Sequence, residues 1–257
     1  MNNIKPIYQN NLITLYKGDC LEVMPKLDIK VNAVISDIPY FQIVKNDWDN
    51  QFVDLNNYLL WCNQCFFCCY NLMEDNSNII IFTGRQYNRF VCSQLDNYFQ
   101  EKRIIIWNRK RQFNQTRGKA FTSGYEPICF FSKGDNSIFN VIKIQSKSKR
   151  KEYNSGFLKN GVCLSDSWND IAALPHNSKE KVEHPTQKPV KLMERCISFS
   201  TNENDTILDF TAGSGTTGIA AMNLNRKCVL IEKDEKYCEI IIQRLKQQEI
   251  ENSEKLF

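Results

Sequence analysis

The tetrapeptide Asp37-Ile38-Pro39-Tyr40 has the residue types needed to hold an amino group on a flat ring. It follows an apolar, β-branched run at 31–36 that is typical of a buried strand, and α/β proteins build their sites at the carboxyl ends of such strands. Pro39 fixes its own backbone and favours an extended Ile38, which would leave the Asp37 carboxylate and the Ile38 carbonyl as neighbouring acceptors. These would take the two N–H bonds of an amino group while Tyr40 stacks on the ring, aiming the nitrogen lone pair at an electrophilic methyl group. Alone, a tetrapeptide of this kind is more commonly just a turn.

A second candidate site is the run DFTAGSGTT at 209–217, which we expect to connect a strand to a helix. Gly213 and Gly215 can adopt positive φ angles and let a ligand approach the backbone closely. The first N–H groups of the following helix, together with the Thr216 hydroxyl, would bind a carboxylate or a phosphate. The pattern therefore predicts a nucleotide-like ligand, although a tight connection without a ligand would look the same.

Two acidic residues narrow the choice of ligand. The turn lacks the third glycine of the dinucleotide fingerprint and the Gly-Lys-Thr ending of a phosphate loop. Asp209 would repel a pyrophosphate and attract a sulfonium, which favours S-adenosylmethionine over NAD or ATP. Glu232 ends the next expected strand, where a carboxylate can accept both hydroxyls of a ribose.

These candidates need a scaffold, and the apolar runs predict one. The expected strands are 12–16, 31–36, 78–83, 103–107, 128–132, 206–210 and 227–232, and the expected helices are 20–27, 55–73, 85–100, 189–200, 216–225 and 235–248. Short apolar strands that alternate with helices indicate an α/β protein with a mostly parallel sheet. The length of 257 residues favours one large domain with a smaller insert.

The composition excludes several classes of protein. Hydrophobic residues make up 42% of the chain and charged residues 24%, which excludes a wholly disordered protein. No run of about 18 apolar residues is present to span a membrane, and the polar start at 1–11 is unlike a secretory signal. We therefore expect a cytoplasmic protein whose eleven cysteines are reduced. Cys62, Cys65 and Cys69 share a helix face, but without a second Cys or His pair we expect core packing and no metal.

Positive charge is concentrated between residues 101 and 160. That stretch holds 14 Lys or Arg and four Asp or Glu, a net charge of +10, so the other residues carry −6. Trp107, Phe113, Phe121 and Tyr125 lie among these charges, which favours a polyanion such as nucleic acid over a solvated lysine face. The candidate phosphate-binding residues are Arg109, Lys110, Arg111, Arg117, Lys119, Lys147, Lys149, Arg150 and Lys151.

Taken together, these residues resemble the DNA amino-methyltransferases that modify adenine N6 or cytosine N4. The aspartate element precedes the glycine turn, as in the permuted β class of that family. Gly18-Asp19 looks like the loop whose acid contacts the cofactor adenine, and Tyr125-Glu126 matches a loop before a strand. His184 to Pro189, which reads HPTQKP, is similar to the segment beside the methionine end of the cofactor.

The resemblance implies a Rossmann-like methyltransferase fold, with helices on both faces of a twisted sheet and a circularly permuted motif order. It implies two halves of one domain, 1–135 and 183–257, separated by a basic target-recognition insert at 136–182 that includes Trp168, although a linker would read the same way. S-adenosylmethionine would be the cofactor and a flipped base of double-stranded DNA the substrate. The residues implied to bind the cofactor are Asp19, Thr186, Lys188, Asp209, Ala212, Gly213, Gly215, Thr216 and Glu232.

Two positions depart from the family pattern. Ile38 replaces the usual first proline, so we expect a slightly less rigid loop that keeps its carbonyl. Phe210-Thr211 replaces the usual Pro-Phe, from which we expect weaker cofactor binding because an aromatic contact is in doubt.

Several functional alternatives stay open at this point. Adenine N6 is the first choice of target atom, because cytosine members of this class more often carry serine in place of Asp37. N4 of cytosine, a protein glutamine amide, RNA, and a catalytically silent DNA-binding protein are the alternatives. The family implies a restriction-modification context and a monomer or homodimer.

Overall fold

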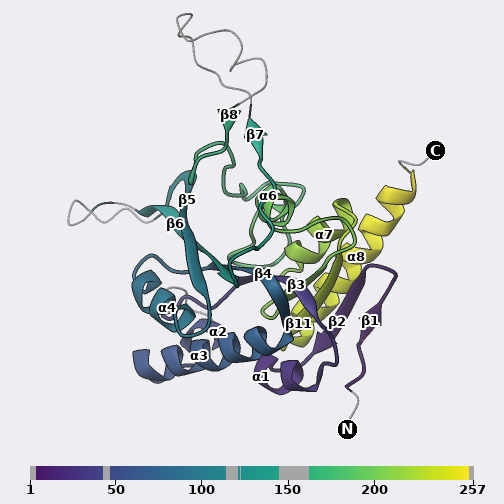
Figure 1. The fold of residues 1–257 in the computed structure, drawn as a ribbon. Coiled ribbons are helices and arrows are strands. Elements are labelled where there is room, and N and C mark those ends of the chain that lie inside the picture. Colours follow the sequence, from purple (N-terminus) through teal and green to yellow (C-terminus); the bar gives the residue numbers. More distant parts are fainter. Residues whose placement is uncertain (1–3, 43–46, 114–120, 122, 145–161, 255–257) are drawn as a thin grey trace, which may run out of the picture.

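The computed structural model describes residues 4–42, 47–113, 121, 123–144 and 162–254. The strands are β1 (Tyr8–Gln9), β2 (Ile13–Lys17), β3 (Val31–Asp37), β4 (Met73–Phe82), β5 (Gln100–Phe113), β6 (Ser123–Lys133), β7 (Lys143–Ile144), β8 (Val162–Cys163), β9 (Ser167–Trp168), β10 (Thr206–Asp209) and β11 (Lys227–Glu232). Nine of them form one sheet in the order β1-β2-β11-β10-β3-β4-β6-β5-β9 (Figure 1). Neighbours from β2 to β4 are parallel, and β6 is antiparallel to both β4 and β5.

Helices cover both faces of the sheet (Figure 1). They are α1 (Cys20–Val23), α2 (Asp47–Asn50), α3 (Leu55–Leu72), α4 (Asn88–Leu95), α6 (Val190–Ser200), α7 (Thr216–Asn223) and α8 (Glu235–Glu254). One apolar cluster joins the sheet to α6, α7 and α8, and a second joins it to α1, α3 and α4. Because a central parallel strand packs on both faces, every position of β3 from Ala33 to Ser36 is buried. The predicted α/β architecture is confirmed.

The two candidate elements lie on neighbouring strands. Strand β10 pairs with β3 in parallel, with Ile207 opposite Ala33 and Leu208 opposite Val34. The carboxyl ends of these two strands therefore meet at one edge of the sheet, although the chain segments are far apart in sequence. The arrangement places the loop at 37–40, hereafter the aspartate loop, beside the glycine turn at 209–217.

Some elements differ in extent from the sequence prediction. Strands β5 and β6 run well beyond the expected 103–107 and 128–132, because the two strands continue as a hairpin past the edge of the main sheet (Figure 1). Helix α4 is shorter than the expected 85–100, and the expected helix at 20–27 changes into a 3-10 turn at Met24–Lys26. Pro25 in that turn cannot donate a helical hydrogen bond.

The expected insert at 136–182 is not separate from the sheet along its whole length. Strands β7 and β8 form a small ribbon that projects from the molecule (Figure 1), whereas β9 pairs with β5 in the main sheet. The Trp168 side chain is buried, and the Trp107 indole donates to the Ile171 carbonyl at 2.8 Å. Trp168 and Ile171 of the insert therefore belong to the core.

The cysteines of α3 occupy the positions expected of small apolar side chains. Cys62, Cys65 and Cys69 are fully buried in the cluster beneath α3, and all eleven cysteines of the chain are free thiols. Burial raises the pKa of the Cys62 thiol, as expected of a packed, unreactive group. Among the described residues, no helix is long and apolar enough to cross a membrane.

Candidate active site

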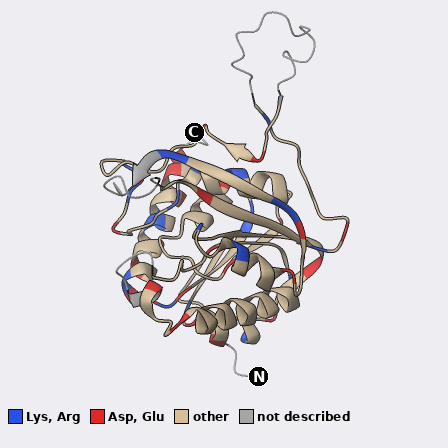
Figure 2. Ribbon diagram, turned by 90° about the vertical axis from the view of Figure 1, so that its left-hand side faces the viewer, with Lys and Arg blue, Asp and Glu red and all other residues tan. Residues whose placement is uncertain are grey.

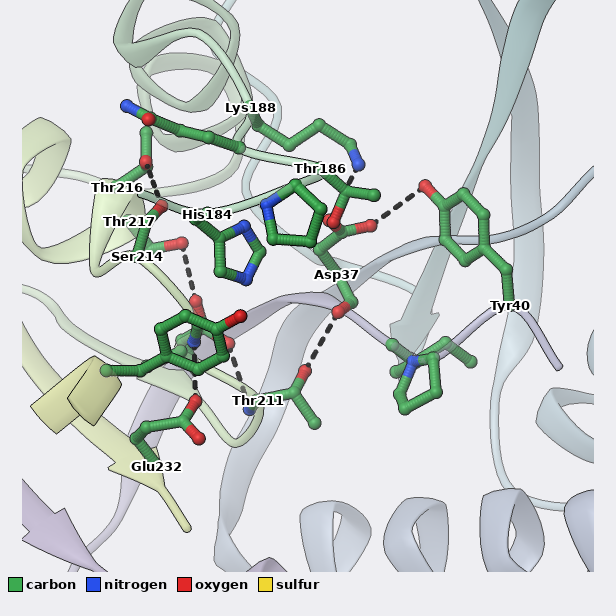
Figure 3. Close-up of a pocket in the computed structure, with 18 of the residues that line it drawn as sticks. Asp37, Tyr40, His184, Thr186, Lys188, Thr211, Ser214, Thr216, Thr217 and Glu232 are labelled. Atoms are coloured by element: carbon green, nitrogen blue, oxygen red, sulfur yellow. Dashed lines mark hydrogen bonds and ion pairs between the residues drawn. The ribbon is translucent and has the colours of Figure 1, made fainter. Parts of the chain in front are cut away.

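A cavity of about 1130 Å³ opens at the carboxyl ends of β3 and β10. Both candidate elements line it, together with residues from the HPTQKP segment (Figure 3). Its lining includes all four residues of the aspartate loop and every expected cofactor-binding residue except Gly215. The aspartate loop and the glycine turn, which the sequence indicated as two candidate sites, thus line the same cavity.

Hydrogen bonds tie the aspartate loop to the glycine turn. The Thr211 hydroxyl donates to the backbone carbonyl of Asp37 at 3.1 Å, across 174 residues of sequence (Figure 3). The Ser36 hydroxyl lies 2.7 Å from the Thr211 hydroxyl and donates to Oδ1 of Asp209 at 2.7 Å. Thr211, which departs from the family pattern, therefore fixes the distance between the two loops.

Other contacts hold the aspartate loop despite its missing proline. The Tyr58 hydroxyl, from α3, donates to the Pro39 carbonyl at 2.8 Å, and the Tyr40 amide donates to the buried Asp49 carboxylate at 2.7 Å. The Ile38 side chain is only 1% exposed and packs in the α3 cluster. Because both neighbours of Ile38 are anchored, the direction of its carbonyl is set without a second proline.

Five side chains form the Asp37 cluster: Asp37, Tyr40, Arg109, Glu126 and Lys188. Lys188 donates to Oδ2 of Asp37 at 2.6 Å and lies 3.4 Å from Oε2 of Glu126. The Tyr40 hydroxyl lies 2.8 Å from Oδ1 of Asp37 and 3.0 Å from Oε2 of Glu126. Arg109 donates to Oε1 of Glu126 at 2.9 Å. Both carboxylate oxygens of Asp37 thus have partners in this state.

The titration of the Asp37 cluster reflects its burial. Burial raises the pKa of Asp37, and the opposing charge of Lys188 does not fully offset it. Burial lowers the pKa of Lys188, but the two facing carboxylates more than compensate, so the net direction is upward. The pKa of the Tyr40 hydroxyl is raised well above its ordinary value by burial and by the same carboxylates. Lys188 is therefore an ammonium and Tyr40 a neutral donor at pH 7.

The backbone of the glycine turn has the geometry expected for close approach. Gly213 and Gly215 have φ angles of 53° and 73°, in the left-handed region that favours glycine. A Cβ on Gly213 would lie 2.9 Å from Nε2 of His184, whose ring covers the turn and stacks edge-on against Tyr237. Helix α7 begins directly after Gly215, so its N-terminus faces the same region.

Glu232 closes the far side of the turn. Its Oε2 accepts from the Gly213 amide at 2.7 Å and its Oε1 accepts from the Asp234 amide at 2.9 Å (Figure 3). Burial raises the pKa of Glu232 to about 7, although these amides favour the charged form.

The Asp209 carboxylate is hydrogen-bonded within the glycine turn and to β3. Its oxygens accept from the hydroxyls of Ser36 and Thr217, at 2.7 and 2.6 Å, and from the Thr211 amide at 3.1 Å. Burial raises its pKa to about 6. These bonds organise the turn, and because Asp209 also lines the cavity, its role toward a sulfonium stays a prediction.

Further expected cofactor contacts take local roles in this structure. Asp19 lines the cavity and caps α1 by accepting from the Leu21 amide at 2.9 Å. The Ala212 amide donates to the Ile231 carbonyl at 2.9 Å, which anchors the turn to β11. Lys188 lies at the Asp37 cluster. The Phe210 side chain packs in the core, with its ring centroid 6.4 Å from that of Trp61. This packing explains how the fold accommodates phenylalanine where the family usually has proline.

The basic residues expected at DNA lie in four kinds of position. Arg109 donates to Glu126 at 2.9 Å and to the Ser123 carbonyl at 3.0 Å, and its role at DNA stays a prediction. Lys110 is exposed on the β5–β6 hairpin, where Figure 2 shows basic segments. Arg111 lies in β5. Arg117, Lys119, Lys147, Lys149, Arg150 and Lys151 lie outside the described residues.

Comparisons with known proteins agree with this geometry. The chain matches a family profile described as DNA methylase, N6_N4_Mtase, over residues 31–243. It is 30% identical over 262 residues to the Type II methyltransferase M.BamHI of Bacillus amyloliquefaciens, covering 96% of this chain and 60% of that protein. It is 28% identical over 261 residues to the Type II methyltransferase M2.MboI of Moraxella bovis, covering 92% of this chain and 89% of that one.

Solved structures show the same fold. The complex of M1.HpyAVI with SAM has a TM-score of 0.66 at 26% identity and covers 91% of this chain and 99% of that one. The PvuII DNA methyltransferase, described as cytosine-N4-specific, has a TM-score of 0.72 at 18% identity, covering 91% and 86%. The fold is a Rossmann-like methyltransferase fold. The chain belongs to the N6/N4 DNA methylase family, and it spans 60% of the length of M.BamHI.

Proposed function

We propose that the chain transfers a methyl group from S-adenosylmethionine to the exocyclic N6 of adenine in double-stranded DNA. The observation that carries the proposal is the hydrogen bond from Thr211 to the Asp37 carbonyl, which joins a candidate amino-group acceptor to a candidate cofactor turn in one cavity. Family membership and the SAM complex of M1.HpyAVI support the same reading.

The lining of the cavity fits this cofactor. Six acidic and four basic side chains line it, a balance that suits a sulfonium cation better than a polyphosphate. Glu232, buried beside the glycine turn, would accept the ribose hydroxyls, and Asp19 would contact the adenine. The N-terminus of α7 at Thr216 would face the carboxylate of the methionine part. Asp209 would act indirectly, by holding Thr211 and Thr217.

The aspartate loop would hold the target base. When bound, S-adenosylmethionine supplies an electrophilic methyl group. Asp37 and the Ile38 carbonyl would accept the two N–H bonds of the amino group, and the Tyr40 ring would flank the base. A carboxylate at this place also stabilises positive charge that develops on the nitrogen. A base within a duplex cannot reach the cavity, so it must be flipped out, at a cost of a few kcal/mol.

The target atom and the substrate are tested together. The protein is incubated with labelled S-adenosylmethionine and duplex DNA from a methylation-deficient host, and the digested nucleosides are identified by mass spectrometry. We expect N6-methyladenine, because Asp37 stands where cytosine members more often have serine. Detection of N4-methylcytosine alone would refute the adenine assignment and leave the enzyme class intact.

Asp37→Ala tests the role of the aspartate loop. We expect the variant to lose methyl transfer while it keeps its affinity for S-adenosylmethionine in calorimetry, since the glycine turn is bonded to the backbone carbonyl of Asp37, which alanine retains. A variant that keeps its activity would remove the role assigned to Asp37. Cofactor binding followed by methyl transfer to unmethylated DNA by the wild-type chain also separates the proposal from a catalytically silent DNA-binding protein, which would bind DNA and transfer no methyl group.

A further inference from the structure

We propose that Glu126 is a positioning residue that takes Lys188 and the Tyr40 hydroxyl from Asp37 when the target base enters. This inference rests on the proposed function and assigns a role in the same site. It arises from a conflict in the Asp37 cluster. Asp37 should accept one N–H bond of the amino group, but both of its carboxylate oxygens already have partners, the Lys188 ammonium at 2.6 Å and the Tyr40 hydroxyl at 2.8 Å.

Lys188 in this position would oppose the reaction. A primary ammonium donates to Asp37 Oδ2 in the way the amino group of a base would, so the two compete for one acceptor. The ammonium also lies 5.1 Å from the centre of the Tyr40 ring, the surface on which the base would rest. Positive charge grows on the target nitrogen during methyl transfer, and a cation held against Asp37 would weaken the stabilisation of that charge.

Glu126 is placed to receive both donors with little movement. Its Oε2 lies 3.4 Å from the Lys188 ammonium and 3.0 Å from the Tyr40 hydroxyl. The Lys188 side chain is 5% exposed and Glu126 13% exposed, so the second carboxylate competes without screening by bulk water. A change of hydrogen-bond partner, rather than a rearrangement of the backbone, therefore frees both oxygens of Asp37.

Glu126 itself is fixed. Arg109 donates to its other oxygen, Oε1, at 2.9 Å, and the same guanidinium reaches the Ser123 carbonyl at 3.0 Å. Trp107 of β5 stands opposite Glu126 of β6, so two paired strands carry this anchor. Glu126 is thus the rigid partner and Lys188, on a flexible four-carbon stem, the mobile one. With two carboxylates and two cations, the charged groups of the cluster sum to zero before and after the exchange.

The test compares Glu126→Gln, Lys188→Met and the double variant in the full-length chain. The substrate is unmethylated genomic DNA, and the readouts are kcat, KM for DNA, calorimetric affinity for S-adenosylmethionine, and the melting temperature. We expect Glu126→Gln to lower kcat by about tenfold or more with cofactor affinity within about twofold, because Lys188 stays on Asp37. Removal of Lys188 should suppress this defect, so the double variant should be faster than Glu126→Gln.

A purely structural role for Glu126 makes the opposite prediction. Loss of a second buried partner would then leave the double variant as slow as Glu126→Gln or slower, and that result would overturn the proposal. Asp75→Asn is the matched control, since it removes a carboxylate paired with Lys133 outside the cavity and should leave kcat unchanged. If Glu126→Gln does not fold, the comparison is repeated with Glu126→Asp, which keeps the charge on a shorter side chain. Recovery of kcat on removal of Lys188 is again the result that supports the proposal, and no recovery overturns it.

Failure of this inference is distinguishable from failure of the proposed function. If the wild-type chain transfers no methyl group to DNA, the proposed function is wrong. If the wild type transfers and Glu126→Gln has the same kcat within about twofold, the proposed function stands and the role of Glu126 is wrong.

Discussion

Replacing Glu232 with glutamine is expected to flatten the pH dependence of the stability of the cofactor-free protein. Burial raises the pKa of Glu232 from an ordinary 4.5 to about 7 in the folded chain. The folded protein therefore binds a proton more tightly than the unfolded chain does. The stability that this proton provides is fully present below pH 4.5 and is lost as the pH rises through about 7.

The expected size follows from the same two values. The gap between 4.5 and about 7 corresponds to about 3 kcal/mol of unfolding free energy, of which about 2–3 kcal/mol falls between pH 5 and pH 8. Glutamine cannot titrate, so this component disappears. The amide group of glutamine would face one of the amides of Gly213 and Asp234, which adds a loss of about 1–3 kcal/mol at every pH.

Urea unfolding followed by tryptophan fluorescence at pH 5, 6, 7 and 8 measures both components. The unfolding free energy of the wild type relative to Glu232→Gln should fall by about 2–3 kcal/mol across this range. Glu239→Gln makes the same chemical change at an exposed position on α8 and serves as the control. A constant difference between wild type and Glu232→Gln would refute the link between burial and the raised pKa.

Three further substitutions test the glycine turn, the loop connection and the DNA-binding surface. Gly213→Ala places a Cβ 2.9 Å from the His184 ring at a φ of 53°, so its melting temperature should fall and calorimetry should show cofactor affinity weakened about tenfold or more. Thr211→Val removes the hydroxyl that reaches Asp37, and kcat should fall about tenfold while Thr211→Ser keeps most of the activity. Lys110→Ala should reduce the slope of log affinity for DNA against log salt by about 1, as measured by fluorescence anisotropy, and an unchanged slope would count against phosphate contact.

The central fold could be predicted from the sequence because its signals are local. A run such as Val31–Asp37, with four consecutive buried positions, is stable only as a central strand of a sheet that is covered on both faces. The two-residue strand β9 has no such signal, and it forms because Trp168 is buried beside β5. The length of the β5–β6 hairpin was also hidden, since beyond Asn108 the described parts of the two strands pair with each other and with no third strand, so no buried apolar run marks them.

The parts of the site that have local sequence signals were predictable as well. Asp37 and the glycine turn are recognisable within a few residues, and their convergence follows from strand order. The partners of Asp37 are not recognisable in this way. Lys188 is 151 residues away in the sequence, and Glu126 comes close to Lys188 only once β6 is part of the sheet. A buried lysine between two carboxylates leaves no periodic pattern, so Lys188 was predicted from the motif alone and assigned to the cofactor.

The position of β10 and β11 between β2 and β3 also affects how the protein is made. A ribosome releases β2 and β3 early, but the strands that lie between them emerge near the end of translation. Until then the two early strands have edges with unpaired backbone N–H and C=O groups, which are prone to pair with other chains. A chain truncated by a premature stop codon before Thr206 would keep those edges and should aggregate. Nascent fragments should likewise lack activity, because the two loops of the site become neighbours only when β10 inserts.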